Sequence, residues 1–269
     1  MDAPRLAGFE RRPDRLGSMF SAISWRYDFL NALMSLGQDG SWRRALAASI
    51  PRGARVLDLC CGSARSSVPA FERAGTTVVG VDVSYAMLAR GRTYAQERGA
   101  RFAPVHGDGF HLPFRDATFD VVTAAFGLRN LVPLPEAARE IRRVLMPGGR
   151  FLALDSVAPA QTAFAPFHAA YLRHVVPLLG RLSPDPNAYR YLSESIFDFG
   201  PPDAVARRLE AAGFDAPVLV RPLLLGAVAL FEGTSPNALP RHARPEGGIV
   251  QRGETGPARA HIATAGGGS

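Results

Sequence analysis

The sequence contains few cysteines, no lysine and no long apolar segment. Cys60 and Cys61 are the only cysteines among its 269 residues, and two adjacent thiols exclude the disulfide framework of a small secreted protein and a four-cysteine zinc site. The longest stretch without a formal charge, residues 156–172, is interrupted by proline, glutamine and histidine. No apolar helix of about 20 residues is therefore predicted. The N-terminus also lacks the basic segment and apolar block of a secretory signal, so we expect a cytoplasmic protein.

The net charge is positive, +7, and all 31 basic residues are arginine. Part of this excess lies in the two terminal segments, and the other arginines are scattered along the chain. A nucleic-acid-binding surface typically has a stripe of basic residues with interleaved aromatic residues. Because this sequence has no such stripe, we expect no nucleic-acid partner.

One folded domain is predicted, over residues 19–234. From residue 235 onward glycine, proline, alanine and arginine dominate, and large aliphatic side chains are rare. Such a segment buries too little apolar surface to offset the entropy lost on ordering. We therefore expect residues 1–18 and 235–269 to be mobile.

Within the domain, β-branched runs alternate with helical stretches, which is typical of a doubly wound α/β sheet. Such a sheet is mostly parallel and binds its ligands at the carboxyl ends of the strands. An N-terminal helical segment over 19–48 and an inserted helical cap over about 158–200 are also predicted. The predicted strands are 55–59, 76–82, 102–106, 119–126 and 150–155, followed by an antiparallel pair at 218–222 and 225–232, with helices at 64–74, 85–98, 134–145 and 202–212.

Three aspartates fall at the ends of successive predicted strands and should converge on one crevice. A turn of small residues, 60–64, lies among them and lets backbone amides approach a ligand at a helix N-terminus. Asp82 lies 20 residues beyond Gly62, where a carboxylate can accept hydrogen bonds from ribose hydroxyls, and Asp108 could meet an adenine amino group. The predicted cofactor-binding residues are Asp58, Gly62, Ser63, Asp82, Asp108 and Gly109.

Structural explanations exist for each of these features, and a dinucleotide is an alternative ligand. The small-residue turn could serve packing alone, Asp82 could cap the following helix, and Asp108-Gly109 could form a turn. A dinucleotide site requires Gly-x-Gly-x-x-Gly, whereas Gly62 is followed by Ala64 and Ser67. S-adenosylmethionine, a nucleoside without phosphate, fits this crevice better. No histidine, cysteine and carboxylate cluster has metal-ligand spacing, so no metal is expected.

Several motifs occur in the order that is typical of one enzyme family. Together they resemble the class I S-adenosylmethionine-dependent methyltransferases, and more closely the UbiE/MenG family of quinone-biosynthesis C-methyltransferases, over about residues 19–233. The motifs are Tyr27-Asp28-Phe29-Leu30-Asn31 with Ser35, Asp39 and Trp42, then Leu112-Pro113-Phe114, Phe126-Gly127-Leu128-Arg129-Asn130, Arg143-Val144-Leu145-Met146-Pro147-Gly148-Gly149, Ala188-Tyr189-Arg190-Tyr191-Leu192, Glu194-Ser195-Ile196 and Gly226-Ala227-Val228-Ala229-Leu230.

The resemblance implies a seven-stranded methyltransferase sheet, S-adenosylmethionine as cofactor, and methylation of a ring carbon of a polyprenylated quinol. The 60–64 turn, Cys-Cys-Gly-Ser-Ala, is similar to that of menaquinone-pathway members, so demethylmenaquinol is preferred over the benzoquinol of the ubiquinone pathway. Departures from the family pattern include Arg65 for an aspartate and Phe231 for a histidine. They leave open a methyltransferase for another aromatic or lipid molecule, or a non-catalytic partner in quinone synthesis.

Three residues are predicted to act on the substrate ring. Arg129 and Asn130 follow the fourth strand at the same edge of the sheet, where Arg129 could stabilise a developing phenolate and Asn130 could orient the hydroxyl. Tyr27 could close the crevice from the N-terminal helix. The structural alternatives are an ion pair for Arg129, a turn residue for Asn130 and an ordinary core aromatic for Tyr27.

The predicted cap carries an apolar face. Phe164, Phe167, Tyr171, Val175 and Leu178 recur at helical spacing. They could line a groove for the prenyl tail while the protein contacts the membrane surface peripherally. A second core or a homodimer contact would account for the same pattern.

Overall fold

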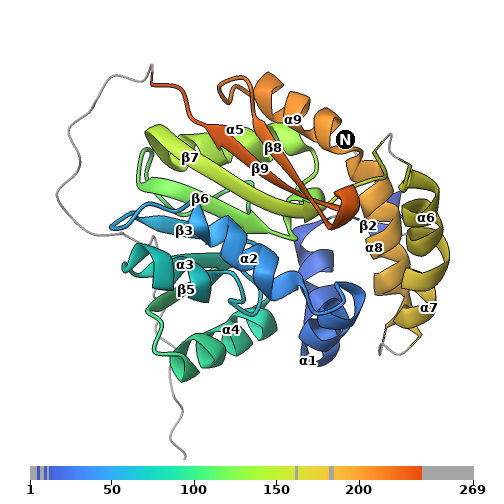
Figure 1. Cartoon of the computed structure of the whole chain (residues 1–269). Coiled ribbons are helices and arrows are strands. Elements are labelled where there is room, and N and C mark those ends of the chain that lie inside the picture. Colours follow the sequence, from blue (N-terminus) through green and yellow to red (C-terminus); the bar gives the residue numbers. More distant parts are fainter. Residues whose placement is uncertain (1–4, 7–8, 11, 161–162, 182–184, 238–269) are drawn as a thin grey trace, which may run out of the picture.

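The computed structural model describes residues 5–6, 9–10, 12–160, 163–181 and 185–237 (Figure 1). The strands are β1 (Arg5–Leu6), β2 (Phe9–Glu10), β3 (Val56–Leu59), β4 (Val78–Asp82), β5 (Phe102–His106), β6 (Phe119–Ala125), β7 (Leu145–Ser156), β8 (Leu219–Leu223) and β9 (Val228–Thr234). The α-helices are α1 (Pro13–Met34), α2 (Asp39–Ala48), α3 (Ser67–Ala74), α4 (Tyr85–Glu97), α5 (Leu134–Val144), α6 (Ala165–Ala170), α7 (Val176–Gly180), α8 (Pro186–Phe199) and α9 (Pro202–Ala211). Shorter turns are the 3-10 helices η1 (Leu128–Asn130) and η3 (Leu224–Gly226) and the π-helix η2 (Tyr171–Val175).

The centre of the molecule is a seven-stranded sheet with the order β5-β4-β3-β6-β7-β9-β8. The strands β3 to β7 pair in parallel, and β9 runs antiparallel to both of its neighbours. This confirms the predicted doubly wound, mostly parallel sheet. After β5 the chain returns to the middle of the sheet to form β6 beside β3, which creates the switch point where open α/β sheets bind ligands.

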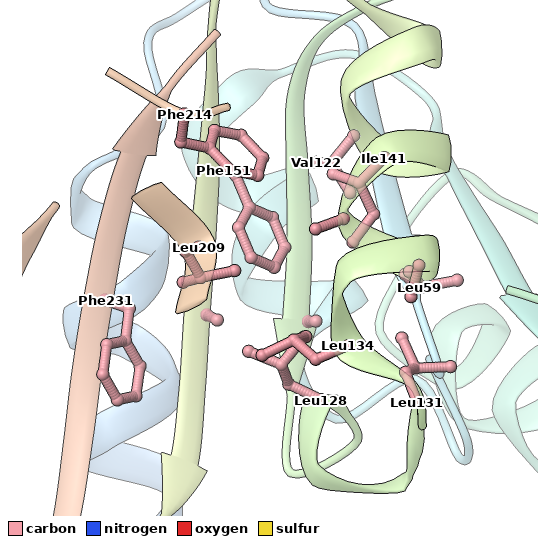
Figure 2. Packing of buried hydrophobic residues seen from close by; sticks show 14 of the residues in the cluster. Leu59, Val122, Leu128, Leu131, Leu134, Ile141, Phe151, Leu209, Phe214 and Phe231 are labelled. Atoms are coloured by element: carbon pink, nitrogen blue, oxygen red, sulfur yellow. The ribbon is translucent and has the colours of Figure 1, made fainter. Parts of the chain in front are cut away.

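Helices cover both faces of this sheet (Figure 1). On one face α5 and α9 pack on the strands. Figure 2 shows Ile141, Phe151, Leu209 and Phe231 among the side chains of this core. The other face is covered by α2 and α3. The central strand β3 is buried along its whole length, as expected for a strand covered on both sides.

A third apolar cluster joins the N-terminal helix to the cap. Leu16 and Met19 of α1 pack with residues of η2, α7 and α8, including Leu172 and Ile196. The helix α1 begins at Pro13, and Leu16 is buried, so the ordered domain starts before the predicted boundary at residue 19. At the other end, Ser235 is buried and its backbone bonds to Gly148 and Gly149. Residues 238–269 of the predicted tail lie outside the described residues.

The fifth parallel strand is longer than predicted. The segment Pro147-Gly148-Gly149, which lies between the predicted helix 134–145 and the predicted strand 150–155, is inside β7. The register between β6 and β7 shifts there: Phe119 pairs with Leu145, while Val121 pairs with Arg150. The extra residues form an irregularity in the strand, and Gly148 has a positive φ of 71° that glycine adopts without steric cost.

Candidate active site

A small cavity of about 70 Å³ lies at the carboxyl ends of β3, β4, β5 and β6, at the switch point of the sheet. Each strand contributes the residues that follow it, and α1 covers the cavity with Leu16 and Phe20. Four of the predicted cofactor-binding residues line this small cavity. They are Gly62, Asp82, Asp108 and Gly109.

The backbone of the turn after β3 approaches the backbone of η1 and of α4 closely. Cys60, Gly62 and Ala64 all have positive φ values, 54°, 51° and 60°. Residues other than glycine adopt such values at an energetic cost. A Cβ atom on Gly127 would lie 2.3 Å from the Cβ of Cys60, and one on Gly91 would lie 2.9 Å from the carbonyl oxygen of Gly62. The small residues therefore allow the turn, η1 and α4 to meet around the small cavity.

Asp82 connects this turn to the next strand. Its Oδ2 accepts a hydrogen bond from the Gly62 amide at 2.9 Å, and its Oδ1 accepts one from the Ser84 amide, also at 2.9 Å. Burial raises the pKa of the Asp82 carboxyl, and the two amides oppose that rise because they favour the charged form. Ser84 caps α4 by accepting a bond from the Met87 amide at 3.2 Å.

Asp108 both forms a turn and faces the small cavity. Its Oδ1 accepts a bond from the Phe110 amide at 3.1 Å, and its Oδ2 lies 3.5 Å from Nδ1 of His111. Gly109 is required for the fit, because a Cβ there would lie 2.9 Å from Cδ2 of Leu131. The turn and the ligand interpretations of Asp108 are thus compatible.

Asp58 and Ser63 do not belong to the small cavity's lining. The Asp58 side chain is fully buried, with Ser67 donating to its Oδ2 at 2.5 Å and Thr123 donating to its Oδ1 at 2.8 Å. Ser63 is 5% exposed. Asp58 therefore differs from the sequence-based expectation of direct ligand contact: it joins β3 to α3 and β6 beneath the turn.

The buried Asp58 carboxyl should make stability depend on pH. Burial raises its pKa from 3.8 to about 6, despite the hydrogen bonds from Ser67 and Thr123. Because the folded state then binds the proton more tightly than the unfolded state, stability falls as pH rises from about 3.8 to about 6 and is level above that. We expect the wild type to lose about 3 kcal/mol across this window relative to Asp58→Asn. Urea unfolding of both proteins at several pH values measures this, and parallel pH curves would contradict it.

A second, large cavity of about 330 Å³ adjoins the small one. Its walls come from α1, α2, the cap and the turn before β9, and they are mostly apolar. Phe20 and Phe126 line both cavities. Phe126 adopts a positive φ of 62° at the end of β6, and its ring lies 6.3 Å from that of Trp42 and 5.0 Å from the guanidinium carbon of Arg43.

Arg129 and Asn130 lie on η1, one beside each cavity. Arg129 lines the large cavity, and its Nη1 donates to Oδ1 of Asp155 at 2.6 Å and to the Phe126 carbonyl at 2.8 Å. The Arg129 amide also bonds to Asp155, at 3.0 Å. Asn130 lines the small cavity, and its Oδ1 accepts a bond from the Tyr191 hydroxyl at 3.0 Å. The ion pair that is the structural alternative for Arg129 is thus present, and both side chains are held at the junction.

Two departures from the family pattern, Arg65 and Phe231, lie outside the lining of both cavities. Arg65 turns away from the small cavity toward α4, where its Nη1 donates to the Tyr94 hydroxyl at 3.3 Å and its guanidinium lies 5.0 Å from the Tyr94 ring. Phe231 is fully buried in the core. The predicted role of Tyr27 concerns a side chain outside the described residues.

Several cavity residues were not singled out from the sequence. Phe20 belongs to the predicted N-terminal helical segment 19–48, Asp39 occurs within a family motif, and Arg43 directly follows that motif. These three residues have one property in common, because each lies on a helix of the N-terminal segment. The sequence does not show that this segment covers the edge of the sheet. Among the described residues, no group of histidine, cysteine and carboxylate side chains could hold a metal ion.

A doubly wound seven-stranded sheet with one reversed strand and a cavity at its switch point is the architecture of a class I S-adenosylmethionine-dependent methyltransferase. The model of the ubiE/COQ5 methyltransferase family matches residues 10–235, and the chain belongs to this family. A demethylmenaquinone methyltransferase from Streptomyces griseus is 41% identical over 231 residues, which are 85% of this chain and 98% of the relative. A demethylmenaquinone methyltransferase from Thermus thermophilus is 41% identical over 81% of this chain and all of the relative.

Solved structures agree with the fold. An S-adenosylmethionine-dependent methyltransferase from Thermotoga maritima superposes with a TM-score of 0.60 at 16% identity, over 82% of this chain and 99% of its own. One from Aquifex aeolicus gives 0.53 at 16% identity, over 83% and 96%. Together with family membership, this identifies the chain as a methyltransferase that uses S-adenosylmethionine. None of the described helices has both the length and the apolar character needed to span a bilayer.

Proposed function

We propose that the protein methylates a ring carbon of a polyprenylated naphthoquinol, demethylmenaquinol, with S-adenosylmethionine bound in the small cavity. The observation that supports this most is the adjoining large, apolar cavity, which shares Phe20 and Phe126 with the small one. A flat aromatic ring at that boundary would face the methyl donor, and an apolar tail could follow the cavity outward. The names of the relatives point to the same substrate.

The small cavity suits the nucleoside part of the cofactor. Asp82 is fixed by two amides and can accept bonds from ribose hydroxyls, and Asp108 can accept from the adenine amino group. Gly62 and Gly109 keep the cavity open by having no side chain, and Asp58 with Ser63 supports the turn from below. When bound, the cofactor supplies an electrophilic methyl group on a sulfonium.

Arg129 and Asn130, which are proposed to act on the ring, lie on either side of the junction of the two cavities. The Arg129 guanidinium can stabilise negative charge as it develops on the quinol oxygen, and Asp155 holds it in place. Asn130 is oriented by Tyr191 and can direct the ring at the junction. Tyr27 is proposed to close the crevice from α1.

The substrate assignment is tested by turnover. The purified protein is incubated with S-adenosylmethionine labelled in the methyl group and with a set of quinols: demethylmenaquinol, the corresponding benzoquinol, and catechols without a prenyl tail. We expect label in the demethylmenaquinol product and less in the others. A clear preference for the benzoquinol or a catechol would overturn the naphthoquinol assignment, and binding of the cofactor without any transfer would favour a non-catalytic role.

We further propose that the mouth of the large cavity contacts the membrane surface. Four exposed apolar side chains lie on its lining: Leu36, Phe164, Phe167 and Leu225, with exposed fractions of 77%, 49%, 75% and 68%. Exposed apolar patches of this kind mark interaction surfaces. A prenyl tail anchored in a bilayer would reach the ring site through this mouth, which gives the patch one occupant, a lipid surface.

Replacing Phe167 by serine should weaken binding to lipid vesicles by about tenfold, because transfer of one phenylalanine side chain from water contributes about 1.5–3 kcal/mol. Sedimentation with phosphatidylcholine and phosphatidylglycerol vesicles measures this. Leu219→Ser is the matched control: Leu219 is 59% exposed at the start of β8 and lines neither cavity. Equal effects of the two substitutions would argue against a specific membrane-facing mouth.

A further inference from the structure

The residues proposed so far for the ring leave one chemical requirement unmet. A quinol carbon becomes a strong nucleophile only as its hydroxyl loses a proton, so a proton acceptor must lie near the ring. Arg129 is permanently protonated and has no acceptor atom, and the Asn130 amide is not a base. The acceptor must therefore come from other side chains of the large cavity.

Asp39 is the one carboxylate among the described residues that line the large cavity. His168 lines it too, but on α6 beside the exposed mouth residues Phe164 and Phe167. Burial lowers the pKa of His168, so the two candidates are distinguished by position rather than by basicity. Asp39 lies on α2, whose next turn carries Trp42, with its ring 6.3 Å from that of Phe126.

A buried arginine ties Asp39 to the junction of the two cavities. Arg43 Nε lies 3.6 Å from Oδ2 of Asp39 and makes no hydrogen bond to any residue that the structure describes. Its Nη1 is anchored on the Ser66 hydroxyl at 2.6 Å, and its guanidinium lies 5.0 Å from the Phe126 ring centroid. Arg43 is therefore fixed between Ser66 and Phe126, and it holds the Asp39 carboxylate beside the wall that both cavities share.

We propose that Asp39 is the catalytic proton acceptor for the ring hydroxyl, with Arg43 as its positioning residue. The inference rests on the proposed quinol methylation. The hydroxyl proton moves to an Asp39 oxygen as the ring carbon bonds to the methyl carbon and the sulfur–methyl bond breaks with its electron pair left on sulfur. The ring C–H proton then leaves and the oxygen is reprotonated from Asp39, so one proton is released per methyl group transferred. A carboxylate suffices because the hydroxyl becomes strongly acidic as the ring donates its electrons.

The first test compares turnover in four variants, of Asp39, Asp203 and His168. Asp39→Asn keeps the shape and loses the base, so kcat should fall by about a hundredfold or more, while the affinity for S-adenosylmethionine stays within twofold. Asp39→Glu keeps a carboxylate and should recover part of the rate. Asp203→Asn is the matched control, because Asp203 also lies in the first turn of a ten-residue helix but is exposed on α9. A loss of less than threefold in Asp39→Asn, or a large loss in His168→Asn alone, would overturn the proposal.

The second test is independent of turnover. A naphthol without a methylatable ring position is bound to the wild type and to Asp39→Asn, and its ionisation is followed by the absorbance of the naphtholate. An anionic acceptor favours the neutral naphthol, so the bound naphthol should ionise at a lower pH, by one unit or more, in Asp39→Asn. The other charged or titratable groups of this cavity, on α2, η1, α6, η2 and α8, are the same in both proteins, so their effects cancel. They are Arg43, Arg129, His168, Tyr171, Tyr189 and Tyr191.

The two tests separate failure of this proposal from failure of the proposed function. Absence of wild-type turnover with every quinol would contradict the function, and the naphthol titration would still decide the role of Asp39. Normal wild-type turnover with unchanged naphthol ionisation in Asp39→Asn would overturn the role of Asp39 alone.

Discussion

Replacing Asp82 by alanine should weaken S-adenosylmethionine binding by about a hundredfold, measured by calorimetric titration. The carboxylate fixes the Gly62 and Ser84 amides and faces the small cavity, so its loss frees the turn and removes an acceptor for the ribose. Hydrogen bonds to charged groups contribute about 1.5–3 kcal/mol each, and about 1.4 kcal/mol corresponds to a tenfold change in affinity.

Asp116→Ala is the control for this measurement. Asp116 is exposed, pairs with Arg143 at 2.7 Å, and lines neither cavity. Its replacement should leave the cofactor affinity within twofold of the wild type. Circular dichroism establishes that both variants fold. If a folded Asp82→Ala protein bound the cofactor as tightly as the wild type, the small cavity would not be the nucleoside site.

Replacing Arg129 by glutamine should both slow methyl transfer and destabilise the fold. Arg129 and Asp155 are 5% and 0% exposed at their side chains, and breaking a buried pair costs about 3–5 kcal/mol because one charge is left without its partner. Removing one donor that stabilises developing negative charge lowers kcat by about 10²- to 10³-fold. Urea unfolding and turnover with demethylmenaquinol measure the two effects.

The double variant Arg129→Gln, Asp155→Asn separates the structural role from the catalytic one. In the double variant the Asp155 carboxylate is gone, so no uncompensated charge is left in the core. The asparagine side-chain oxygen can still accept the hydrogen bond from the backbone amide of residue 129. We expect most of the lost unfolding free energy to return while kcat stays low. Recovery of both stability and turnover would mean that Arg129 acts only by holding the fold.

The sheet was predictable because its strands are local patterns. The third parallel strand has the predicted bounds, 102–106, and Asp82 ends its strand as expected. Asp58 shows where this reasoning stops. It lies within β3, where Leu57 and Leu59 face the α5 side and Asp58 points to the α3 side, toward Ser67. Side chains alternate along a strand, so a single residue decides between a ligand contact and a buried support.

The large cavity depended on contacts that no local pattern encodes. Phe126 lies at a strand end, but its positive φ directs the ring by a conformation that the sequence pattern does not predict for phenylalanine. Asp39 is 18% exposed at its side chain, and it shares the large cavity with residues of the cap, which is far away in the sequence. Arg65 donates to Tyr94 of α4 and does not line the small cavity, a placement that its neighbours in the sequence do not predict.

The aromatic wall formed by Phe20 and Phe126 has a thermodynamic consequence. Because both rings border both compartments, an occupant of one that shifts either ring changes the free energy of filling the other. Such linkage is reciprocal: whatever factor the methyl donor adds to quinol affinity, the quinol adds to donor affinity. Loss of the methyl group from the donor would then change the affinity for the product ring, which couples completion of the reaction to release of the product.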